Sequence, residues 1–399
     1  MQANESNGTQ PRLLFLLSRF LDGGIDTVLV EYLRHLSQRG CYRLTLAIAT
    51  DMGELEVFRN RVPHDVRVVH LVSSAALTRL PQRKIRQKLP LPLKLWNEIA
   101  LQPVRRSIIG MELKRLAREH DVVIDFDCCH YSYLRNVGCR KVAWFHFSFD
   151  KLMEQNPRRM KRIGRRLEWY DRVVCISQAM LAEGERLFPL LKGKLRLVYN
   201  AKDPASLMER ASEEVADERI RQPYIIAVER LEESQKDLST LLRAYQLLRT
   251  RHGHTERLYI MGKGRSEQQL RALAKELAVD ETVYFLGFSS NPLPWIYRSR
   301  MVVHSAKFEG LPTVMIEALQ LGKLIVASDC PTGPAEILAH GDAGVLTPVG
   351  DAEAMAAAMH HLLTDTELQE QIKKGMRKQQ YLFSFEATDR QFDRLVKSL

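Results

Sequence analysis

The sequence has few cysteines and no long apolar run. Its six cysteines form no CxxC pair and lack the regular spacing of a disulfide framework or a zinc site. No stretch approaches the roughly 18 apolar residues of a membrane-spanning helix, and the polar start MQANESNGTQP lacks the apolar core of a secretory signal. We therefore expect free thiols, no membrane span and a cytoplasmic location.

The first half of the chain has fewer acidic than basic residues. Residues 1–200 contain 34 Lys and Arg against 20 Asp and Glu, whereas the remaining residues contain 25 against 28. The positive net charge of the chain, +11, therefore comes entirely from the first half. This asymmetry predicts an anionic partner, which could be nucleic acid, a phospholipid surface or a charged glycolipid. The alternative is a basic, solvated surface without a partner.

The chain is too long for one ordinary hydrophobic core, which stops growing at about 300 residues. Short apolar runs such as Leu13–Leu17, typical of buried parallel strands, alternate with helical patterns. The polar, acidic segment 200–222 predicts a linker, and Tyr224–Val228 then starts a second alternating series. Alternation of this kind predicts two doubly wound α/β domains, residues 1–200 and 201–380.

Two basic segments interrupt the first domain. In Arg79–His120, basic residues are interleaved with Leu, Ile and Trp96, and Pro157–Arg166 has the sequence PRRMKRIGRR. Such segments suit an anionic membrane face. An ordinary exposed helical insertion is the alternative for the first of them.

Two cations follow the first strand of the second domain. Arg230 comes directly after the strand and Glu229, and Lys236 stands just before a helix that Asp237 is expected to cap. Side chains at the carboxyl end of a strand face the ligand cleft of an open parallel sheet. Bidentate Arg and mobile Lys together suit phosphate oxygens, although two solvated surface cations would give the same pattern.

A second pattern, EGLPTVMIEAL, begins at Glu309. Gly310 precedes a helix whose first turn should contain Pro312, and Glu317 lies inside this helix. A glycine turn into a helix N-terminus exposes free N–H groups that bind anions. Acids on both sides of such an anion can accept hydrogen bonds from hydroxyls, as a bound sugar nucleotide requires.

These motifs together resemble the retaining, GT-B-fold glycosyltransferases of family 4, also called glycosyl transferases group 1. The resemblance covers most of residues 222–347 and lies in ERLEESQKD, MGKGRSEQQLRAL, VYFLGF, EGLPTVMIEAL and SDCPTGPAEIL. Family members that add sugars to bacterial lipopolysaccharide or capsule share the PTGP loop and a basic first domain. Glu229 departs from the family pattern, which often has glycine before the arginine.

The resemblance implies a GT-B fold, in which two Rossmann-like domains face each other across a cleft and a C-terminal helix, residues 381–399, packs near the hinge. It implies that Arg230 and Lys236 bind the donor diphosphate, Glu317 the ribose hydroxyls and Glu309 a hydroxyl of the transferred sugar. The other implied donor contacts are Gly23, Gly24, Gly310, Leu311, Pro312 and Thr313.

His146, at the end of KVAWFH, is expected near the donor sugar and the acceptor. A buried core histidine is the alternative there. Asp127 is a candidate acceptor contact. The segment DFD, residues 125–127, resembles the metal-binding DxD of another glycosyltransferase fold, but the rest of that pattern is missing.

The expected activity is transfer of a hexose or N-acetylhexosamine, with retention, from a nucleotide sugar with UDP as the favoured nucleotide. The expected acceptor is a saccharide or lipid-linked saccharide at an anionic membrane surface, and no metal, cofactor or nucleic acid is expected. A GT-B nucleotide-sugar epimerase and a basic nucleic-acid-binding protein are the alternatives. A Rossmann oxidoreductase is disfavoured, because FLDGGIDT lacks the GxGxxG spacing.

Overall fold

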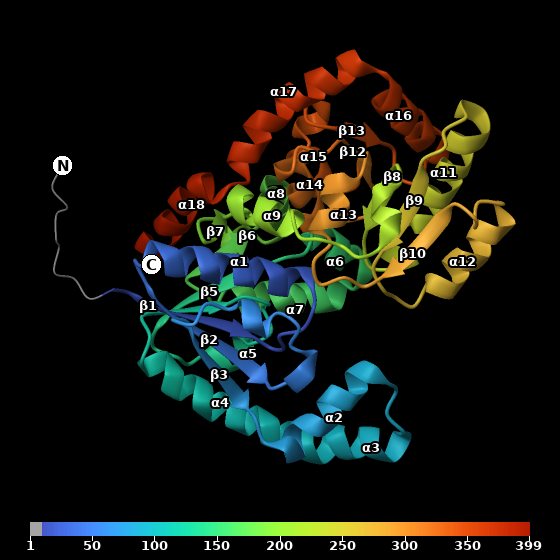
Figure 1. Cartoon of the computed structure of the whole chain (residues 1–399). Helices are drawn as coiled ribbons and strands as arrows, with labels where there is room; N and C mark the ends of the chain where they lie inside the picture. Colours follow the sequence, from blue (N-terminus) through green and yellow to red (C-terminus); the bar gives the residue numbers. More distant parts are fainter. Residues whose placement is uncertain (1–9) are drawn as a thin grey trace, which may run out of the picture.

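The computed structural model describes residues 10–399, which form two lobes with a parallel sheet in each (Figure 1). The first sheet has, within these residues, seven strands in the order β3-β2-β1-β4-β5-β6-β7. All neighbouring pairs are parallel. The strands are β1 (Arg12–Leu17), β2 (Arg43–Thr50), β3 (Arg67–Val72), β4 (Val122–Asp125), β5 (Arg140–Phe145), β6 (Arg172–Cys175) and β7 (Leu195–Leu197).

Helices cover both faces of this sheet, which is why its central strands are continuously apolar. They are α1 (Gly24–Arg39), α2 (Ala75–Arg86), α3 (Leu91–Trp96), α4 (Gln102–Arg118), α5 (Tyr131–Leu134), α6 (Phe149–Gln155), α7 (Pro157–Leu167) and α8 (Gln178–Leu187), with the π-helical turn η3 (Asn97–Leu101) between α3 and α4. The 3₁₀ turns are η1 (Gly53–Leu55), η2 (Arg59–Arg61) and η4 (Pro189–Leu191).

The second lobe repeats this architecture. Its sheet has six strands among the described residues, all parallel, in the order β10-β9-β8-β11-β12-β13. They are β8 (Tyr224–Val228), β9 (Arg257–Met261), β10 (Val283–Gly287), β11 (Met301–His304), β12 (Ile325–Ser328) and β13 (Val345–Thr347). The helical segments are α9 (Pro204–Ala211), η5 (Glu218–Arg221), α10 (Glu233–Lys236), α11 (Leu238–His252), α12 (Glu267–Glu276), α13 (Leu293–Arg298), α14 (Thr313–Gln320), α15 (Pro334–Ile337), η6 (Ala339–Gly341) and α16 (Ala352–Thr364).

The chain crosses between the lobes twice, and the two crossings touch. Lys202, on the first crossing, donates its backbone N–H to Phe383 on the second, at 2.9 Å. The second crossing follows α17 (Thr366–Leu382) and leads into α18 (Phe385–Lys397). Helix α18 packs on α1 of the first lobe, where Tyr32 contacts Phe385 edge to face and Arg39 pairs with Asp393 at 2.9 Å. The last helix therefore ties the two lobes together (Figure 1).

The expected fold class is confirmed, since two parallel α/β sheets are joined at one hinge. One local expectation was wrong. Asp237, the residue before α11, has a left-handed conformation with φ of 49°, and its side chain makes no cap bond to the helix backbone. Its carboxylate accepts a hydrogen bond from the Thr240 hydroxyl at 2.8 Å instead. None of the helices in residues 10–399 is both long and apolar enough to cross a lipid bilayer.

Candidate active site between the two lobes

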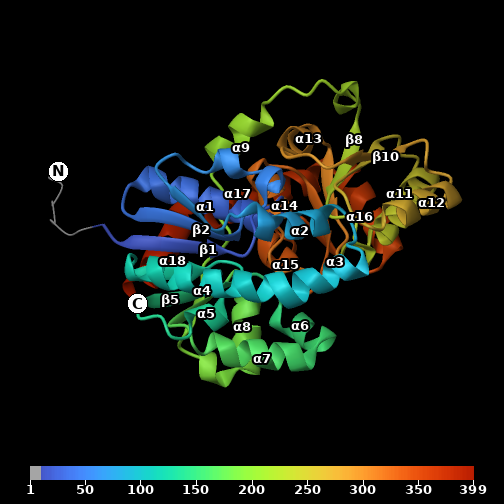
Figure 2. The ribbon, with the colours of Figure 1, turned by 90° about the horizontal axis from the view of Figure 1, so that it is seen from below.

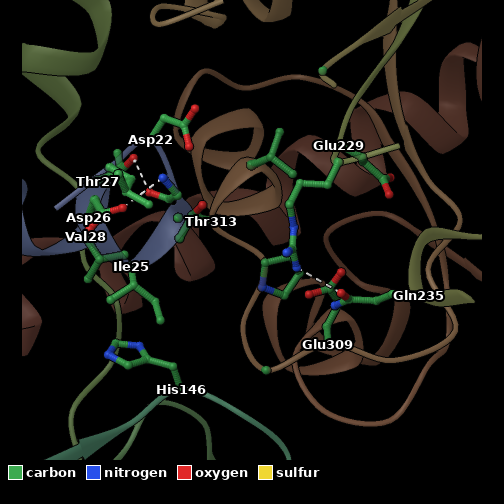
Figure 3. A pocket seen from close by; sticks show the side chains of 18 of the residues that line it. Asp22, Ile25, Asp26, Thr27, Val28, His146, Glu229, Gln235, Glu309 and Thr313 are labelled. Atoms are coloured by element: carbon green, nitrogen blue, oxygen red, sulfur yellow. Dashed lines mark hydrogen bonds between the residues drawn. The ribbon is translucent and has the colours of Figure 1, made fainter. Parts of the chain in front are cut away.

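A cleft of about 840 Å³ lies between the lobes, where the carboxyl ends of both sheets meet. This is the edge at which open parallel sheets bind ligands, because the strand-to-helix loops with free polar groups gather there. Figure 3 shows side chains from both lobes around the cleft, among them Asp26 and His146 of the first lobe and Glu309 and Thr313 of the second, with Thr313 close to Asp26. Every site residue predicted from the sequence lines this cleft: Gly23, Gly24, Asp127, His146, Arg230, Lys236, Glu309, Gly310, Leu311, Pro312, Thr313 and Glu317.

The two lobes approach closely at glycines. A Cβ atom added to Gly310 would lie 2.3 Å from the carbonyl oxygen of His146, in the other lobe. One added to Gly24, the first residue of α1, would lie 3.8 Å from the Thr313 hydroxyl. The N-termini of α1 and α14 therefore face each other across the cleft, and both carry backbone N–H groups without helical partners. An anion between them would be held from both sides.

Arg230 is held at the cleft wall by the loop on which it lies. The glycines of the MGKG segment pack under this loop, since a Cβ on Gly262 would lie 1.8 Å from the Glu229 carbonyl oxygen. A Cβ on Gly264 would lie 2.2 Å from the Leu231 carbonyl oxygen. The exposed Arg230 guanidinium donates a hydrogen bond to Gln235 Oε1 at 3.0 Å. Its other donors are free to meet a ligand in the cleft.

Lys236, at the end of α10, is buried and paired with Glu309. Burial lowers the pKa of Lys236, but Glu309 and Glu229 outweigh it, so the net shift is upward. Burial raises the pKa of Glu309, but Lys236 and His304 reverse this and lower it to about 2. Both groups are therefore charged at neutral pH, and the ammonium is fixed next to the cleft by a carboxylate.

His304, at the end of β11, is a site residue that the sequence reasoning missed. Its Nδ1 lies 2.8 Å from Glu229 Oε1 and its Nε2 lies 3.3 Å from Glu309 Oε1, and the ring is fully buried. Burial lowers the pKa of His304, but the two carboxylates raise it to about 9. A charged imidazolium therefore sits behind Glu309. Glu229, which departs from the family pattern, is buried and pairs with this histidine.

The loop that contains Glu309 is supported from below by the PTGP segment. The Thr332 hydroxyl donates a hydrogen bond to the Glu309 carbonyl, and Gly333 has φ of 90°. A Cβ on Gly333 would lie 2.7 Å from Pro312 Cδ, so only glycine fits there. Pro312 was expected in the first turn of α14, but it precedes Thr313 as the N-cap residue in extended conformation, with ψ of 110°. The N–H groups of the first turn remain available to a ligand.

Glu317, in the middle of α14, has a buried partner that the sequence reasoning also missed. Its Oε1 accepts a hydrogen bond from Lys202 Nζ at 2.7 Å, and Lys202 is fully buried. Lys202 follows the last strand of the first lobe, in YNAKDP, where nothing in the local pattern marks it as a partner of α14. Asn200 also lines the cleft, and its Oδ1 is buried without a hydrogen-bond partner among residues 10–399. Such a group is suited to a ligand donor.

His146 has the geometry of a neutral acceptor. Its Nε2 lies 2.7 Å from the Phe126 carbonyl oxygen, so this nitrogen carries the proton. Burial lowers the pKa of His146 to about 4, and Nδ1 is therefore left as an unprotonated acceptor at neutral pH. On the same side, the Asp26 carboxylate accepts from the backbone N–H of Gly23 at 2.9 Å and fixes the start of α1.

The DFD segment forms a hydrogen-bonded cluster with His130. Asp125 accepts from His130 Nδ1 at 2.9 Å and from the Tyr170 hydroxyl at 2.5 Å. Asp127 accepts from the backbone N–H of Ser18 at 2.8 Å. These carboxylates already have donors from the protein itself, which gives the cluster a structural role at the carboxyl edge of the first sheet. Asp127 also reaches the cleft.

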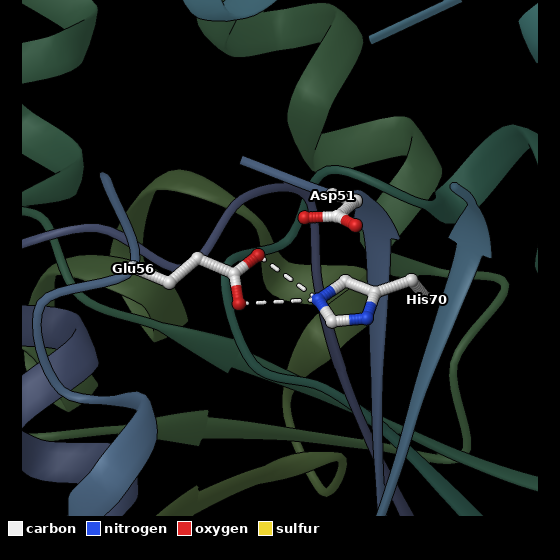
Figure 4. Close-up of side chains that lie close together, drawn as sticks. All are labelled: Asp51, Glu56 and His70. Atoms are coloured by element: carbon white, nitrogen blue, oxygen red, sulfur yellow. Dashed lines mark hydrogen bonds and ion pairs between the residues drawn. The ribbon is translucent and has the colours of Figure 1, made fainter. Parts of the chain in front are cut away.

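A second cluster of possible metal ligands lies near the ends of β2 and β3 (Figure 4). Both oxygens of the buried Glu56 carboxylate lie within 3.1 Å of His70 Nε2, and Oε1 also accepts from the backbone N–H of Met52. Asp51 accepts from the backbone N–H of Gly53 at 2.7 Å. Hydrogen bonds from β3 and from the backbone that follows β2 thus already satisfy these carboxylates.

Two family models match the chain in succession. Glycosyltransferase Family 4 matches residues 22–206, and Glycosyl transferases group 1 matches residues 209–379. Neither covers half of the chain by itself, but together they follow the two lobes over nearly the whole length. The chain belongs to the GT-B glycosyltransferases.

This glycosyltransferase is similar to bacterial glycosyltransferases. It is 29% identical over 51% of its length to the N-acetylgalactosamine-N,N'-diacetylbacillosaminyl-diphospho-undecaprenol 4-alpha-N-acetylgalactosaminyltransferase of Campylobacter jejuni, of which the match spans 53%. It is 26% identical to an uncharacterized glycosyltransferase of Haemophilus influenzae, over 70% of this chain and 75% of that one. The matches thus span between about half and three quarters of these relatives.

The fold of this glycosyltransferase is shared with Anabaena HepE, crystallised in complex with UDP. The TM-score is 0.73 at 18% identity, and the alignment covers 97% of this chain and 100% of that one. At this identity the likeness establishes the fold alone.

Proposed function

We propose that the protein transfers a hexose or N-acetylhexosamine from a UDP-sugar to a saccharide or lipid-linked saccharide, with retention at the anomeric carbon. One observation carries the proposal. Arg230, Lys236 and the N-terminus of α14 converge in one cleft, between the carboxylates of Glu309 and Glu317. The name of the Campylobacter relative gives a diphospho-undecaprenol acceptor, and the Anabaena neighbour holds UDP, which supports these substrate classes.

The proposed chemistry depends on stabilising the leaving group. When the bond between the sugar and the diphosphate breaks, both of its electrons pass to the phosphate oxygen while the sugar becomes oxocarbenium-like. Arg230, Lys236 and the α14 N–H groups stabilise the growing negative charge, and they are already in place before the reaction. Charged hydrogen bonds contribute about 1.5 to 3 kcal/mol each, which corresponds to roughly 10- to 100-fold in rate.

The two carboxylates then recognise hydroxyls on either side of the diphosphate. Glu317 gives one oxygen to Lys202, which leaves the other for the ribose hydroxyls. Glu309 is kept ionised by Lys236 and His304, so it accepts from a hydroxyl of the transferred sugar. His146 Nδ1 accepts from a second hydroxyl across the cleft. Asp127 is placed to contact the acceptor.

The proposal includes no metal or cofactor, because cations of the chain itself face the diphosphate. Adding EDTA should therefore leave the rate unchanged. Dependence of the rate on Mg²⁺ or Mn²⁺ would overturn this part of the proposal.

A donor screen tests the proposed activity. The protein is incubated with a panel of UDP-, GDP-, TDP- and CMP-sugars, and thermal shift and release of free nucleotide are measured. We expect one UDP-sugar to raise the melting temperature and to be consumed, and Arg230→Ala to lower nucleotide release at least tenfold. No response to any nucleotide sugar would refute the proposal. A nucleotide sugar converted to its epimer without any acceptor would instead identify the GT-B epimerase.

A further inference from the structure

The first lobe carries a helical hairpin that projects from its sheet (Figures 1 and 2). Helix α2 runs antiparallel to the continuous helical path formed by α3, η3 and the start of α4. Arg105 holds the two arms together by donating to the Leu77 carbonyl at 3.0 Å, and Lys84 lies 3.8 Å from Glu98 nearer the tip. The hairpin follows β3 directly, so it begins at the carboxyl edge of the sheet, the edge that faces the cleft.

The hairpin exposes apolar side chains and buries polar ones. Asn97 and Arg105 are buried between its arms, where the Arg105 guanidinium donates to Asn97 Oδ1 at 2.8 Å. Four large apolar residues on α3 and η3, which we call the apolar crest, are exposed to solvent: Leu91 (66%), Leu95 (47%), Trp96 (59%) and Ile99 (71%). A helix surrounded by water ordinarily turns its apolar face inward. The side chains of the apolar crest are therefore left in water, where large apolar groups are unfavourable.

The charged residues around the apolar crest indicate which kind of surface binds it. Residues 75–101 contain six Lys and Arg against one acid, Glu98. Helix α7 of the same lobe exposes five more cations: Arg158, Arg159, Lys161, Arg162 and Arg165. An amphipathic segment with Trp and aliphatic residues on one face and Lys and Arg beside them is the pattern of an interfacial helix on anionic lipid.

Other occupants fit less well. Nucleic acid would use the cations but would leave the aliphatic crest in water. A second copy of this chain, related by a two-fold axis, would bring one basic patch against the other. Anionic lipid satisfies both the apolar side chains and the charge.

We propose that the hairpin docks the protein on an anionic phospholipid bilayer, with the apolar crest in the headgroup region and the surrounding Lys and Arg on lipid phosphates. The inference deepens the proposed function, on which it rests for the lipid-linked acceptor. Docking by the hairpin brings the mouth of the cleft close to the surface in which such an acceptor is held. Binding to lipid itself requires no donor.

The test uses the full chain and vesicles of phosphatidylcholine with or without 30% phosphatidylglycerol. We expect sedimentation with the anionic vesicles in 0.1 M salt and at least tenfold weaker binding to pure phosphatidylcholine or in 0.5 M salt. The double variant Leu95→Glu/Ile99→Glu should bind at least tenfold more weakly. Leu190→Glu, which changes an exposed apolar residue outside the hairpin, should bind like the parent.

Further readouts separate the outcomes. Brominated lipid should quench tryptophan fluorescence in the parent, and Trp96→Phe should lose this quenching while still binding. Donor-dependent nucleotide release without acceptor should be the same in the double variant as in the parent. If neither protein released nucleotide, the proposed activity would be refuted, but the docking proposal would not be affected. Equal vesicle binding by parent and double variant would overturn the proposal. The proposal would also be overturned if the parent formed a dimer in lipid-free buffer and the double variant were a monomer. Binding of nucleic acid in preference to the vesicles would overturn it as well.

Discussion

Replacing Lys236 with methionine removes the buried ammonium while keeping most of the apolar stem. Its partner Glu309 has its pKa lowered to about 2 and stays ionised, so the substitution leaves a buried carboxylate without its main counter-ion. Breaking a buried ion pair from one side costs about 3 to 5 kcal/mol. His304, 3.3 Å from Glu309, still compensates part of the charge, and we therefore expect a loss near the lower limit, about 3 kcal/mol.

The measurement is a double-mutant cycle by urea unfolding. We expect the combined variant Lys236→Met/Glu309→Gln to lose less free energy of unfolding than the two single variants together, with a coupling of about 1.5 to 3 kcal/mol. Lys373→Met is the matched control, because Lys373 pairs with Glu370 at 2.7 Å on the exposed face of α17. An exposed pair contributes about 1 kcal/mol or less.

The same variant reports on the reaction. Lys236→Met should lower donor-dependent nucleotide release about 10- to 100-fold, since one charged contact with the leaving diphosphate is lost. If Lys236→Met unfolded within 0.5 kcal/mol of the parent and the double variant were additive, the description of a buried, coupled pair would be refuted. Unchanged nucleotide release in a folded variant would refute the role of Lys236 toward the donor.

Three other expectations concern lobe closure, pH and the ribose site. Gly310→Ala should keep the lobes apart, because its Cβ would lie 2.3 Å from a carbonyl oxygen of the first lobe; we expect about 100-fold lower kcat/KM and a larger radius of gyration in X-ray scattering. Despite burial, the carboxylates raise the pKa of His304 from its ordinary 6.5 to about 9, which gives stability that is complete below pH 6.5 and is lost as pH rises through 9. The lowered pKa of Glu309, about 2 against 4.5, gives stability that is complete above pH 4.5 and is lost as pH falls through 2, so urea midpoints between pH 2 and 10 should decline on both sides. Lys202→Met should weaken UDP binding about tenfold by calorimetry, because it removes the partner that orients Glu317.

The first two of these have a control. Gly138→Ala, where an added Cβ meets no atom within 4 Å, should leave kcat/KM and radius unchanged. His304→Gln should flatten the alkaline limb of the stability profile and leave the acid limb. If Gly310→Ala behaved like the parent, the close approach of the lobes at Gly310 would be contradicted. If the alkaline limb survived His304→Gln, the pairing of His304 with its carboxylates would be contradicted. Unchanged UDP affinity in Lys202→Met would contradict the role of the contact between Lys202 and Glu317.

Local patterns in the sequence were enough for the fold class and for much of the candidate site. Apolar runs alternate with helical periodicity because buried parallel strands need apolar residues on both faces, and this period is visible without any coordinates. Arg230, Glu309 and Glu317 are recognisable because each lies at a fixed place relative to the end of a strand or the start of a helix. The topology of a doubly wound sheet then brings such places to one edge.

The sequence alone did not determine which charges meet. Lys236 and Glu309 are 73 residues apart, and Lys202, on the crossing between the lobes, is 115 residues from Glu317 in the second lobe. His304 ends an ordinary buried strand, and only the packing of β8 beside β11 places it against Glu229. Local periodicity reports the environment of a residue but not its long-range partner. That partner is decided by how the sheets, the hinge and the lobes pack.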